Sequence, residues 1–125
     1  MASINGLYIK GTSKTPEIEF TPGILNISGR SIPEDSVAFY QPLVRWIETY
    51  LSNPEKFTKV NFKIEYINSG SNRFLFTILK MLDKSFKEGL NIAISWYYET
   101  DDDTIRGLGQ DLQTFIEIPV NMVEM

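Results

Sequence analysis

The 125-residue chain contains neither cysteine nor histidine, and these two absences exclude several kinds of chemistry. Without cysteine there is no disulfide, no thiolate nucleophile and no iron–sulfur or zinc-ribbon site. Without histidine there is no Ser-His-Asp hydrolysis, no HExxH protease and no His-ligated metal. No other pattern in the chain singles out catalytic residues, so no motif supports an enzymatic function, and we predict no cofactor or metal.

Long apolar runs and basic clusters are also missing. The longest apolar stretches have about five residues, whereas a membrane helix needs about 20. The net charge is −4, so the chain lacks the basic surface that nucleic-acid binding needs. Residues 1–6 do not show the basic and then apolar segments of a signal peptide. We therefore predict a cytoplasmic protein that binds neither nucleic acid nor a membrane.

The residues that are present suffice for one hydrophobic core. Apolar residues make up 42% of the chain and aromatic residues 13%, and a chain of this length is the size of one domain. No linker, repeat or low-complexity tract divides it. We therefore expect a single domain over residues 1–125, with an ordered core at about 7–120.

Apolar side chains recur with two periods along the chain, one typical of strands and one typical of helices. Glu34, Asp35 and Ser36 are predicted to lie in the first turn of a helix, after a loop over 29–33, because carboxylates there oppose the positive end of the helix dipole. The predicted strands cover residues 7–10, 17–20, 24–28, 59–67, 90–98 and 116–120, and the predicted helices cover 34–52, 72–88 and about 101–113.

This order of elements predicts a small α/β domain with a mixed sheet. Residues 17–28 are typical of an N-terminal hairpin, and two strand–helix–strand units predict parallel crossovers. The strand at 59–67 places Tyr66 on its apolar side, while Lys63 and Glu65 on the other side would not be buried beneath a helix. We therefore expect the helices mainly on one face of the sheet.

The segment from Tyr66 to Arg73 is the first candidate site, because it joins a strand to a helix. The unpaired N–H groups and positive partial charge of a helix N-terminus favour a phosphate, and a small hydroxyl beside Gly70 is open to a protein kinase. The same residues also fit a structural function, in which Asn68, Ser69 or Ser71 caps the helix. The residues alone favour capping and leave the functional interpretation open.

Other clusters carry weaker signals. The carboxylates of Glu99 and residues 101–103 could hold a divalent cation, but their spacing does not fit an EF-hand, so helix capping is favoured. Residues 107–109, Gly-Leu-Gly, lie within or after a helix, which is the wrong context for a dinucleotide fingerprint. Trp46 and Trp96 lie on apolar stripes, so we expect both in the core.

Five stretches of the chain are distinctive: Thr15 to Ile18, Ile27 to Ser36 (ISGRSIPEDS), Trp46-Ile47, Tyr66 to Ser71 (YINSGS) and Trp96 to Glu99 followed by aspartates. Together, and in this order over roughly residues 7–120, they resemble the SiaC family of bacterial regulatory phosphoproteins. The resemblance implies a fold similar to the STAS domains of anti-sigma-factor antagonists. It also implies a protein-interaction switch instead of an enzyme.

The resemblance implies three partners. A histidine-kinase-like Ser/Thr protein kinase adds a phosphate and a PP2C-type phosphatase removes it. The unphosphorylated form binds and regulates an output enzyme, which in the best-known system is a diguanylate cyclase, and this links the switch to cyclic di-GMP and biofilm formation.

The resemblance also implies a phosphoacceptor. The family acceptor is the Thr that directly follows Asn in a Tyr-Leu-Asn-Thr-Ser-Ser stretch, and that position falls on Ser69 here. Gly70 stands where the family has Ser, and Ser71 is the alternative acceptor. A phosphate adds about −1.5 to −2 charge, with which Arg73 or Arg30 would pair. The residues expected to contact partners are Asn68, Gly70, Ser71, Asn72, Arg73 and Arg30.

One alternative comes from another class of function. A small-ligand-binding or enzymatic domain of the same fold would use a groove near residues 68–73 together with the acidic loop at 99–103.

Overall fold

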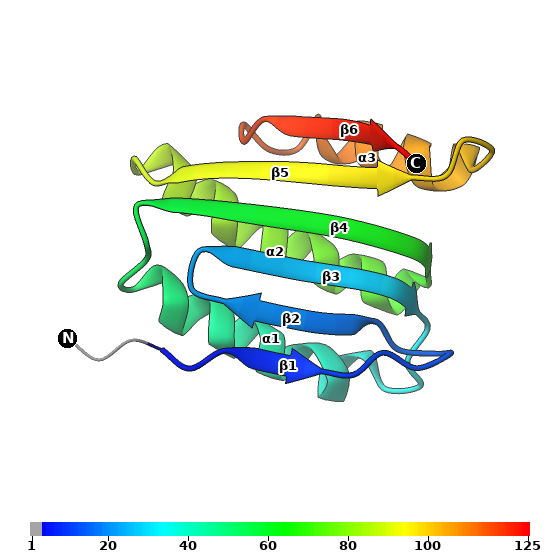
Figure 1. The fold of residues 1–125 in the computed structure, drawn as a ribbon, viewed down its shortest axis with the longest axis horizontal. Coiled ribbons are helices and arrows are strands. Elements are labelled where there is room, and N and C mark those ends of the chain that lie inside the picture. Colours follow the sequence, from blue (N-terminus) through cyan, green and yellow to red (C-terminus); the bar gives the residue numbers. More distant parts are fainter. Residues whose placement is uncertain (1–3) are drawn as a thin grey trace.

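The structure is a computed structural model that describes residues 4–125. Residues 1–3 lie outside the described residues. The predictions of a domain over 1–125 and of no signal-peptide pattern in residues 1–6 include these three residues. The described residues form six strands and three helices in the predicted order (Figure 1). The elements are β1 (Leu7–Ile9), β2 (Glu17–Thr21), β3 (Ile24–Ser31), α1 (Ser36–Leu51), β4 (Phe57–Ile67), α2 (Ser69–Lys87), β5 (Asn91–Tyr98), α3 (Asp103–Leu112) and β6 (Val120–Glu124).

The strands form one mixed sheet in which neighbours in sequence are neighbours in space, from β1 to β6. The pairs β1–β2 and β2–β3 are antiparallel, which confirms the predicted hairpin. The pairs β3–β4, β4–β5 and β5–β6 are parallel, and a helix joins each pair. Residues 4–125 therefore hold three parallel crossovers, one more than the two predicted.

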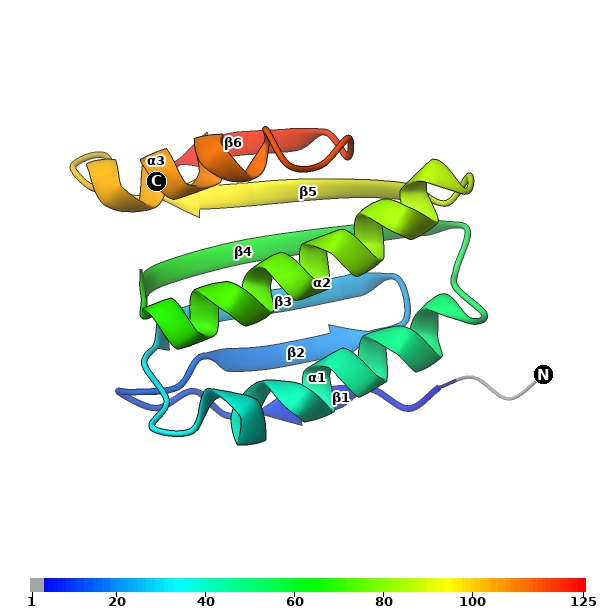
Figure 2. The ribbon, with the colours of Figure 1, turned by 180° about the vertical axis from the view of Figure 1, so that it is seen from behind.

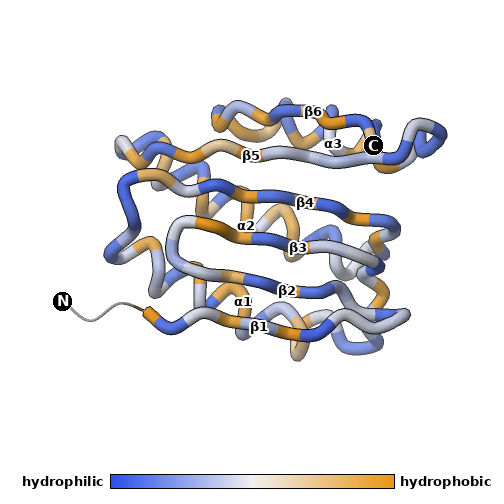
Figure 3. The backbone as a smooth tube through the Cα atoms, viewed as in Figure 1, coloured by the Kyte–Doolittle hydropathy of each residue, from blue (hydrophilic) through white to orange (hydrophobic). Residues whose placement is uncertain are grey.

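The helices of the described residues all cover the same face of the sheet (Figure 2). Hydrophilic and hydrophobic residues alternate along the strands (Figure 3), because successive side chains of a strand point to opposite faces. Lys63 and Glu65 are exposed on the face without helices, hereafter the open face. The prediction of helices on one face is confirmed.

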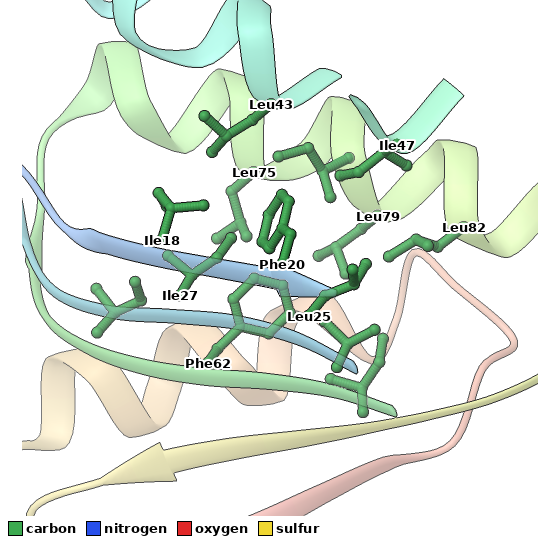
Figure 4. Packing of buried hydrophobic residues seen from close by; sticks show 14 of the residues in the cluster. Ile18, Phe20, Leu25, Ile27, Leu43, Ile47, Phe62, Leu75, Leu79 and Leu82 are labelled. Carbon is green, nitrogen blue, oxygen red and sulfur yellow. The ribbon is translucent and has the colours of Figure 1, made fainter. Parts of the chain in front are cut away.

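The core fills the layer between the sheet and the helices (Figure 4). Trp46 and Trp96 are 8% and 1% exposed, as predicted. Burial of one such large side chain stabilises the fold by roughly 1.5–3 kcal/mol, so this layer holds the helix ends in place against the strands. Its other large members include Ile18, Phe20, Leu25, Ile27, Leu43, Ile47, Phe62, Leu75, Leu79 and Leu82.

The predicted loop over 29–33 begins too early: β3 continues to Ser31, and only residues 32 and 33 of the predicted loop lie outside the strand. Gly29 has a φ of +108°, a conformation that glycine adopts without steric cost. The register between β3 and β4 shifts at this point, between Gly29 and Arg30. The shift lets the ladder continue past the glycine, and β3 is longer than its alternating pattern predicts.

The start of α1 also differs from the prediction. The helix begins at Ser36, and the Asp35 side chain caps it by accepting a hydrogen bond from the Ala38 N–H (3.0 Å). Glu34 therefore precedes the helix instead of lying in its first turn.

The closing strand is β6, Val120–Glu124, and not the predicted 116–120. The backbone N–H groups of Glu117 and Ile118 donate to Asp83 Oδ1 of α2 at 2.8 and 3.2 Å instead of to a neighbouring strand. Pro119 follows, and it has no N–H to donate. The ladder with β5 therefore begins only at Val120.

Candidate functional site

The candidate residues 68–73 lie where α2 begins, directly after β4. α2 begins at Ser69, three residues before the predicted start at 72. The reason is the cap: Asn68 Oδ1 accepts a hydrogen bond from the Ser71 N–H (2.8 Å). Asn68 is thus the helix cap among the three candidates, and Ser69 is the first helical residue with an exposed side chain.

Ser69 and Ser71 have opposite environments although they are close in sequence. Ser71 is 0% exposed, and its Oγ accepts a hydrogen bond from Ser31 Oγ (2.8 Å). The hydroxyls of Ser31 and Tyr40 are also hydrogen-bonded to each other. Of the two serines, only Ser69 is therefore accessible from solvent.

Gly70 brings the starts of two helices together. A Cβ atom on Gly70 would lie 2.5 Å from Ser36 Oγ in α1, closer than real Cβ contacts. Both helices begin at the same end of the sheet (Figure 2). Because each helix N-terminus carries unpaired N–H groups and a positive partial charge, the surface at Ser69 is suited to an added negative charge.

Two arginines have different positions relative to Ser69. Arg73 is exposed and lies four residues after Ser69 in α2, so the two positions are neighbours on one helix face. Arg30 is exposed on β3, with its guanidinium carbon 5.7 Å from the ring centroid of Tyr66. Its neighbour Ser31 accepts the Asn68 N–H through its carbonyl (2.9 Å), so Arg30 belongs to the same end of the sheet.

The sequence predicts Tyr66 on the apolar side of β4, and this prediction is wrong. The Tyr66 side chain is 52% exposed. Gly29 is paired with Ile64, but Arg30 is paired with Tyr66, so Glu65 is an extra residue in β4. An extra residue reverses the alternation that follows it. Tyr66 therefore turns outward towards Arg30, while Ile64 remains buried.

Asn72, another predicted contact residue, is half-buried in the first turns of α2. Its backbone N–H donates to the Asn68 carbonyl (2.9 Å), which is part of the helix start. Most of the predicted residues therefore gather at one place, Ser69 and Arg73 at the surface and Asn72 and Ser71 beneath it.

Within the acidic residues Glu99 and 101–103, the structure shows the helix capping that their spacing favours. Asp102 caps α3 by accepting a hydrogen bond from the Ile105 N–H (3.0 Å), and Asp103 lies in the first turn. Residues 4–125 contain no group of three or more acidic side chains arranged to hold a metal ion. Gly107 and Gly109 lie inside α3, which agrees with the exclusion of a dinucleotide loop.

Two hollows lie over the open face of the sheet, with volumes of about 230 and 420 Å³. Both are lined by Glu17 of β2, Ser28 of β3 and Lys63 of β4. Sequence reasoning missed these residues because they come from three strands that only the pairing of the sheet brings together. Among residues 4–125, no helix is both long and apolar enough to span a bilayer.

Comparison with known proteins gives a family for nearly the whole chain. A family model described as "SiaC family regulatory phosphoprotein" matches residues 9–125. A curated protein of Pseudomonas aeruginosa (strain UCBPP-PA14), described as uncharacterized, is 24% identical over 118 residues, which cover 93% of this chain and 94% of that protein.

Solved structures from Pseudomonas aeruginosa have the same fold. SiaC has a TM-score of 0.91 at 22% identity, and the match covers 98% of this chain and 100% of that one. Apo-SiaC has a TM-score of 0.89 at 24% identity, with coverage of 96% and 99%. A chain from the crystal structure of the diguanylate cyclase SiaD in complex with its activator SiaC has a TM-score of 0.91 at 23% identity, with coverage of 95% and 99%.

Proposed function

Because the chain belongs to the SiaC family of regulatory phosphoproteins, which its match over residues 9–125 shows, we propose that it is a phosphorylation-controlled interaction switch in bacterial signalling. Membership of the family confirms the resemblance seen in the sequence. It also confirms the prediction that the protein is regulatory and is not an enzyme. In this proposal residues 1–125 act as one cytoplasmic regulatory domain.

The acceptor in this proposal is Ser69. The observation that carries it is the contrast between two hydroxyls in a family of phosphoproteins: Ser69 is exposed at the first position of α2, and Ser71 is fully buried. The N-terminus of a helix stabilises a negative charge, and Arg73 one turn further along can pair with a phosphate. The domain can therefore carry a phosphate on Ser69 without losing its fold.

The phosphate acts in this proposal as a local electrostatic block to binding. A partner surface that fits the neutral Ser69 side chain would have to cover a group with about −1.5 to −2 charge after phosphorylation. Burying such a charge without a partner of opposite sign costs several kcal/mol. That cost abolishes binding through Asn68, Gly70, Asn72 and the arginines without any rearrangement of the sheet.

The proposed output partner is a diguanylate cyclase, which connects the switch to cyclic di-GMP and to biofilm control. The support is a relative of the same fold, SiaC, which is the activator in a solved complex with the diguanylate cyclase SiaD. The proposed modifying partners are a histidine-kinase-like Ser/Thr protein kinase and a PP2C-type phosphatase, as the family resemblance implies.

The first test is an intact mass and a phosphopeptide map of the protein from its native cells, with and without phosphatase treatment. We expect one phosphate, on Ser69. A phosphate on Ser71 would keep the switch and move its site, and no phosphate under any growth condition would contradict the proposal.

Variants then test whether the phosphate controls binding. We expect Ser69→Ala to bind a purified diguanylate cyclase of the native organism like the unphosphorylated chain, and Ser69→Asp to lose that binding. Thr104→Asp is the matched control, because Thr104 is an exposed hydroxyl residue in the first turn of α3. Equal binding by Ser69→Ala, Ser69→Asp and the control would contradict a switch at Ser69.

A further inference from the structure

Ser69 and Gly70 lie between two residues that are both bonded to Ser31 at the end of β3. On one side, the Asn68 N–H donates to the Ser31 carbonyl (2.9 Å). On the other side, the Ser31 hydroxyl donates to the Ser71 hydroxyl (2.8 Å). The Ser71 N–H donates in turn to Asn68 Oδ1 (2.8 Å), which closes a ring of hydrogen bonds around the exposed acceptor.

A third hydroxyl extends this ring into α1. Ser31 has one hydroxyl proton, which it donates to Ser71, so in its contact with Tyr40 the Ser31 oxygen accepts and Tyr40 donates. The order is therefore Tyr40 to Ser31 to Ser71. It connects three elements, α1, β3 and α2, at the first turn of α2.

The chain of hydroxyls is closed off from solvent. Tyr40 is 3% exposed, and Ser31 and Ser71 are each 0% exposed. Burial raises the pKa of the Tyr40 hydroxyl, so that group remains protonated and able to donate. Its ring is held in place by Phe74 of α2, stacked at a centroid distance of 5.3 Å and an interplanar angle of 8°.

Loss of one member of this chain leaves the neighbouring hydroxyl without one of its hydrogen-bond partners. Buried hydroxyls have no water to replace a missing protein partner, so removing one proton donor loosens the remaining bonds. The bonds at risk are those that hold Asn68 and Ser71, the residues on either side of the acceptor. The exposed side chains at the site do not take part in them.

We propose that Tyr40, Ser31 and Ser71 are positioning residues that hold the first turn of α2 in one conformation and so present the Ser69 hydroxyl to the kinase. This inference rests on the proposed function, because a fixed conformation of the first turn of α2 matters for a kinase only if Ser69 is the phosphoacceptor. Phosphoryl transfer requires the attacking oxygen in line with the phosphate. A misplacement of about 1 Å can reduce such a rate by up to about 10²-fold.

The test compares two tyrosines of the same helix. Tyr40→Phe removes only the hydroxyl and keeps the aromatic ring against Phe74. Tyr50→Phe is the matched control, because Tyr50 is 1% exposed and its hydroxyl is bonded to Thr58 Oγ1 (2.7 Å) at the other end of α1. Both variants lose a buried hydroxyl–hydroxyl bond, and Tyr50→Phe also removes the acceptor of the Glu55 N–H (3.2 Å), so a general loss of stability affects the control at least as much.

The first measurement is hydrogen exchange of the backbone amides of residues 68–73 in the full chain. We expect exchange at these amides to rise about tenfold in Tyr40→Phe and to stay unchanged in Tyr50→Phe. Ser31→Ala should match Tyr40→Phe, and the double variant should add little, because both act through one chain of bonds. Equal exchange in the Tyr40 and Tyr50 variants would overturn the inference.

The second measurement is the steady-state phosphorylation of each variant by the kinase that phosphorylates the wild-type chain. We expect kcat to fall about tenfold for Tyr40→Phe with KM unchanged, because the exposed contacts remain and only the placement of the hydroxyl is lost. An unchanged kcat would overturn the inference. If no kinase modifies the wild-type chain, the proposed function fails, while the exchange data still decide whether these hydroxyls hold the turn.

Discussion

At the scale of single residues, the local environment decides what each polar side chain does. Ser69 and Ser71 differ in sequence position by two, yet one is exposed and the other is 0% exposed and bonded to Ser31. A helix turns by about 100° per residue, so two such positions face opposite sides. Once Asn68 sets the start of α2, Ser69 faces solvent and Ser71 faces the core.

Asp83 shows the same effect on a charged group. Its side chain on α2 is only 3% exposed and lies 3.2 Å from Lys87 Nζ. Burial alone raises the pKa of this carboxyl, but the hydrogen bonds from the Glu117 and Ile118 backbone and from Lys87 outweigh it and lower the pKa below its usual value. The carboxylate thus attaches the segment before β6 to α2.

Asp83→Asn should lower the free energy of unfolding at neutral pH by about 1–3 kcal/mol, since it removes the charge from these hydrogen bonds. Because the folded-state pKa lies below the unfolded value of about 3.9, the charge stabilises the fold above that value. The stabilisation disappears as the pH falls through the folded-state pKa. Urea unfolding of wild type and variant at neutral pH and at about pH 2.5 measures both differences.

The control for this prediction is Asp111→Asn, at an exposed carboxylate of α3. We expect it to change stability by less than about 0.5 kcal/mol at either pH. The prediction is wrong if the cost of Asp83→Asn is the same at both pH values, since the charge would then contribute nothing.

At the scale of elements, close contacts determine where each helix lies on the sheet. α3 lies directly on the indole of Trp96 in β5, whose Nε1 donates to the Ile105 carbonyl (2.8 Å). A Cβ atom on Gly109 would lie 2.4 Å from this ring. The position therefore requires glycine because of a close approach and not because of a turn.

Gly109→Ala should destabilise the domain by about 1–3 kcal/mol, because Trp96 is 1% exposed and the overpacked ring has little room to move. Gly107→Ala in the same helix meets nothing within 4 Å. It should stabilise the domain by about 0.5–1 kcal/mol through helix propensity. Thermal unfolding of the two variants beside wild type checks both signs, and a stabilising Gly109→Ala would refute this account of how α3 packs.

Element boundaries were predictable where a local signal sets them and not where the tertiary structure does. The start of α3 follows from its aspartates, as expected. The end of β3 and the start of β6 do not, since they depend on the register shift beside Gly29 and on Asp83 of a distant helix. The third parallel crossover follows from the parallel pairing of β6 with β5, which is a contact between strands that a local pattern does not show.

At the scale of the whole molecule, the fold places Ser69 at one end of the domain, away from the hydrophobic core. The helices cover one face and both α1 and α2 begin at one end (Figure 2). The large core lies between them and the strands (Figure 4). A change of charge at Ser69 thus acts at one end of the domain, outside the core.

Ser69→Asp should therefore leave the fold and its stability nearly unchanged. An acidic residue in the first turn of a helix is favourable or neutral, so we expect the free energy of unfolding to change by less than about 1 kcal/mol. Thermal unfolding and the amide spectrum of the variant check this, with changes confined to the first turns of α1 and α2. Spectral changes that spread through β5 and β6 would mean that the proposed switch works by rearrangement instead of by local charge.

The sequence by itself determined the order of elements, the mixed sheet with one covered face, the two buried tryptophans and the family, because each depends on local periodicity or on contiguous motifs. It also placed Asn68, Ser69 and Arg73 at a helix start. Only the tertiary structure decided which serine is exposed, that Tyr66 turns outward to Arg30, and that the hydroxyls of Ser31 and Tyr40 bond to the start of α2. These features come from strand register and from contacts between distant elements, and no local pattern in the chain encodes them.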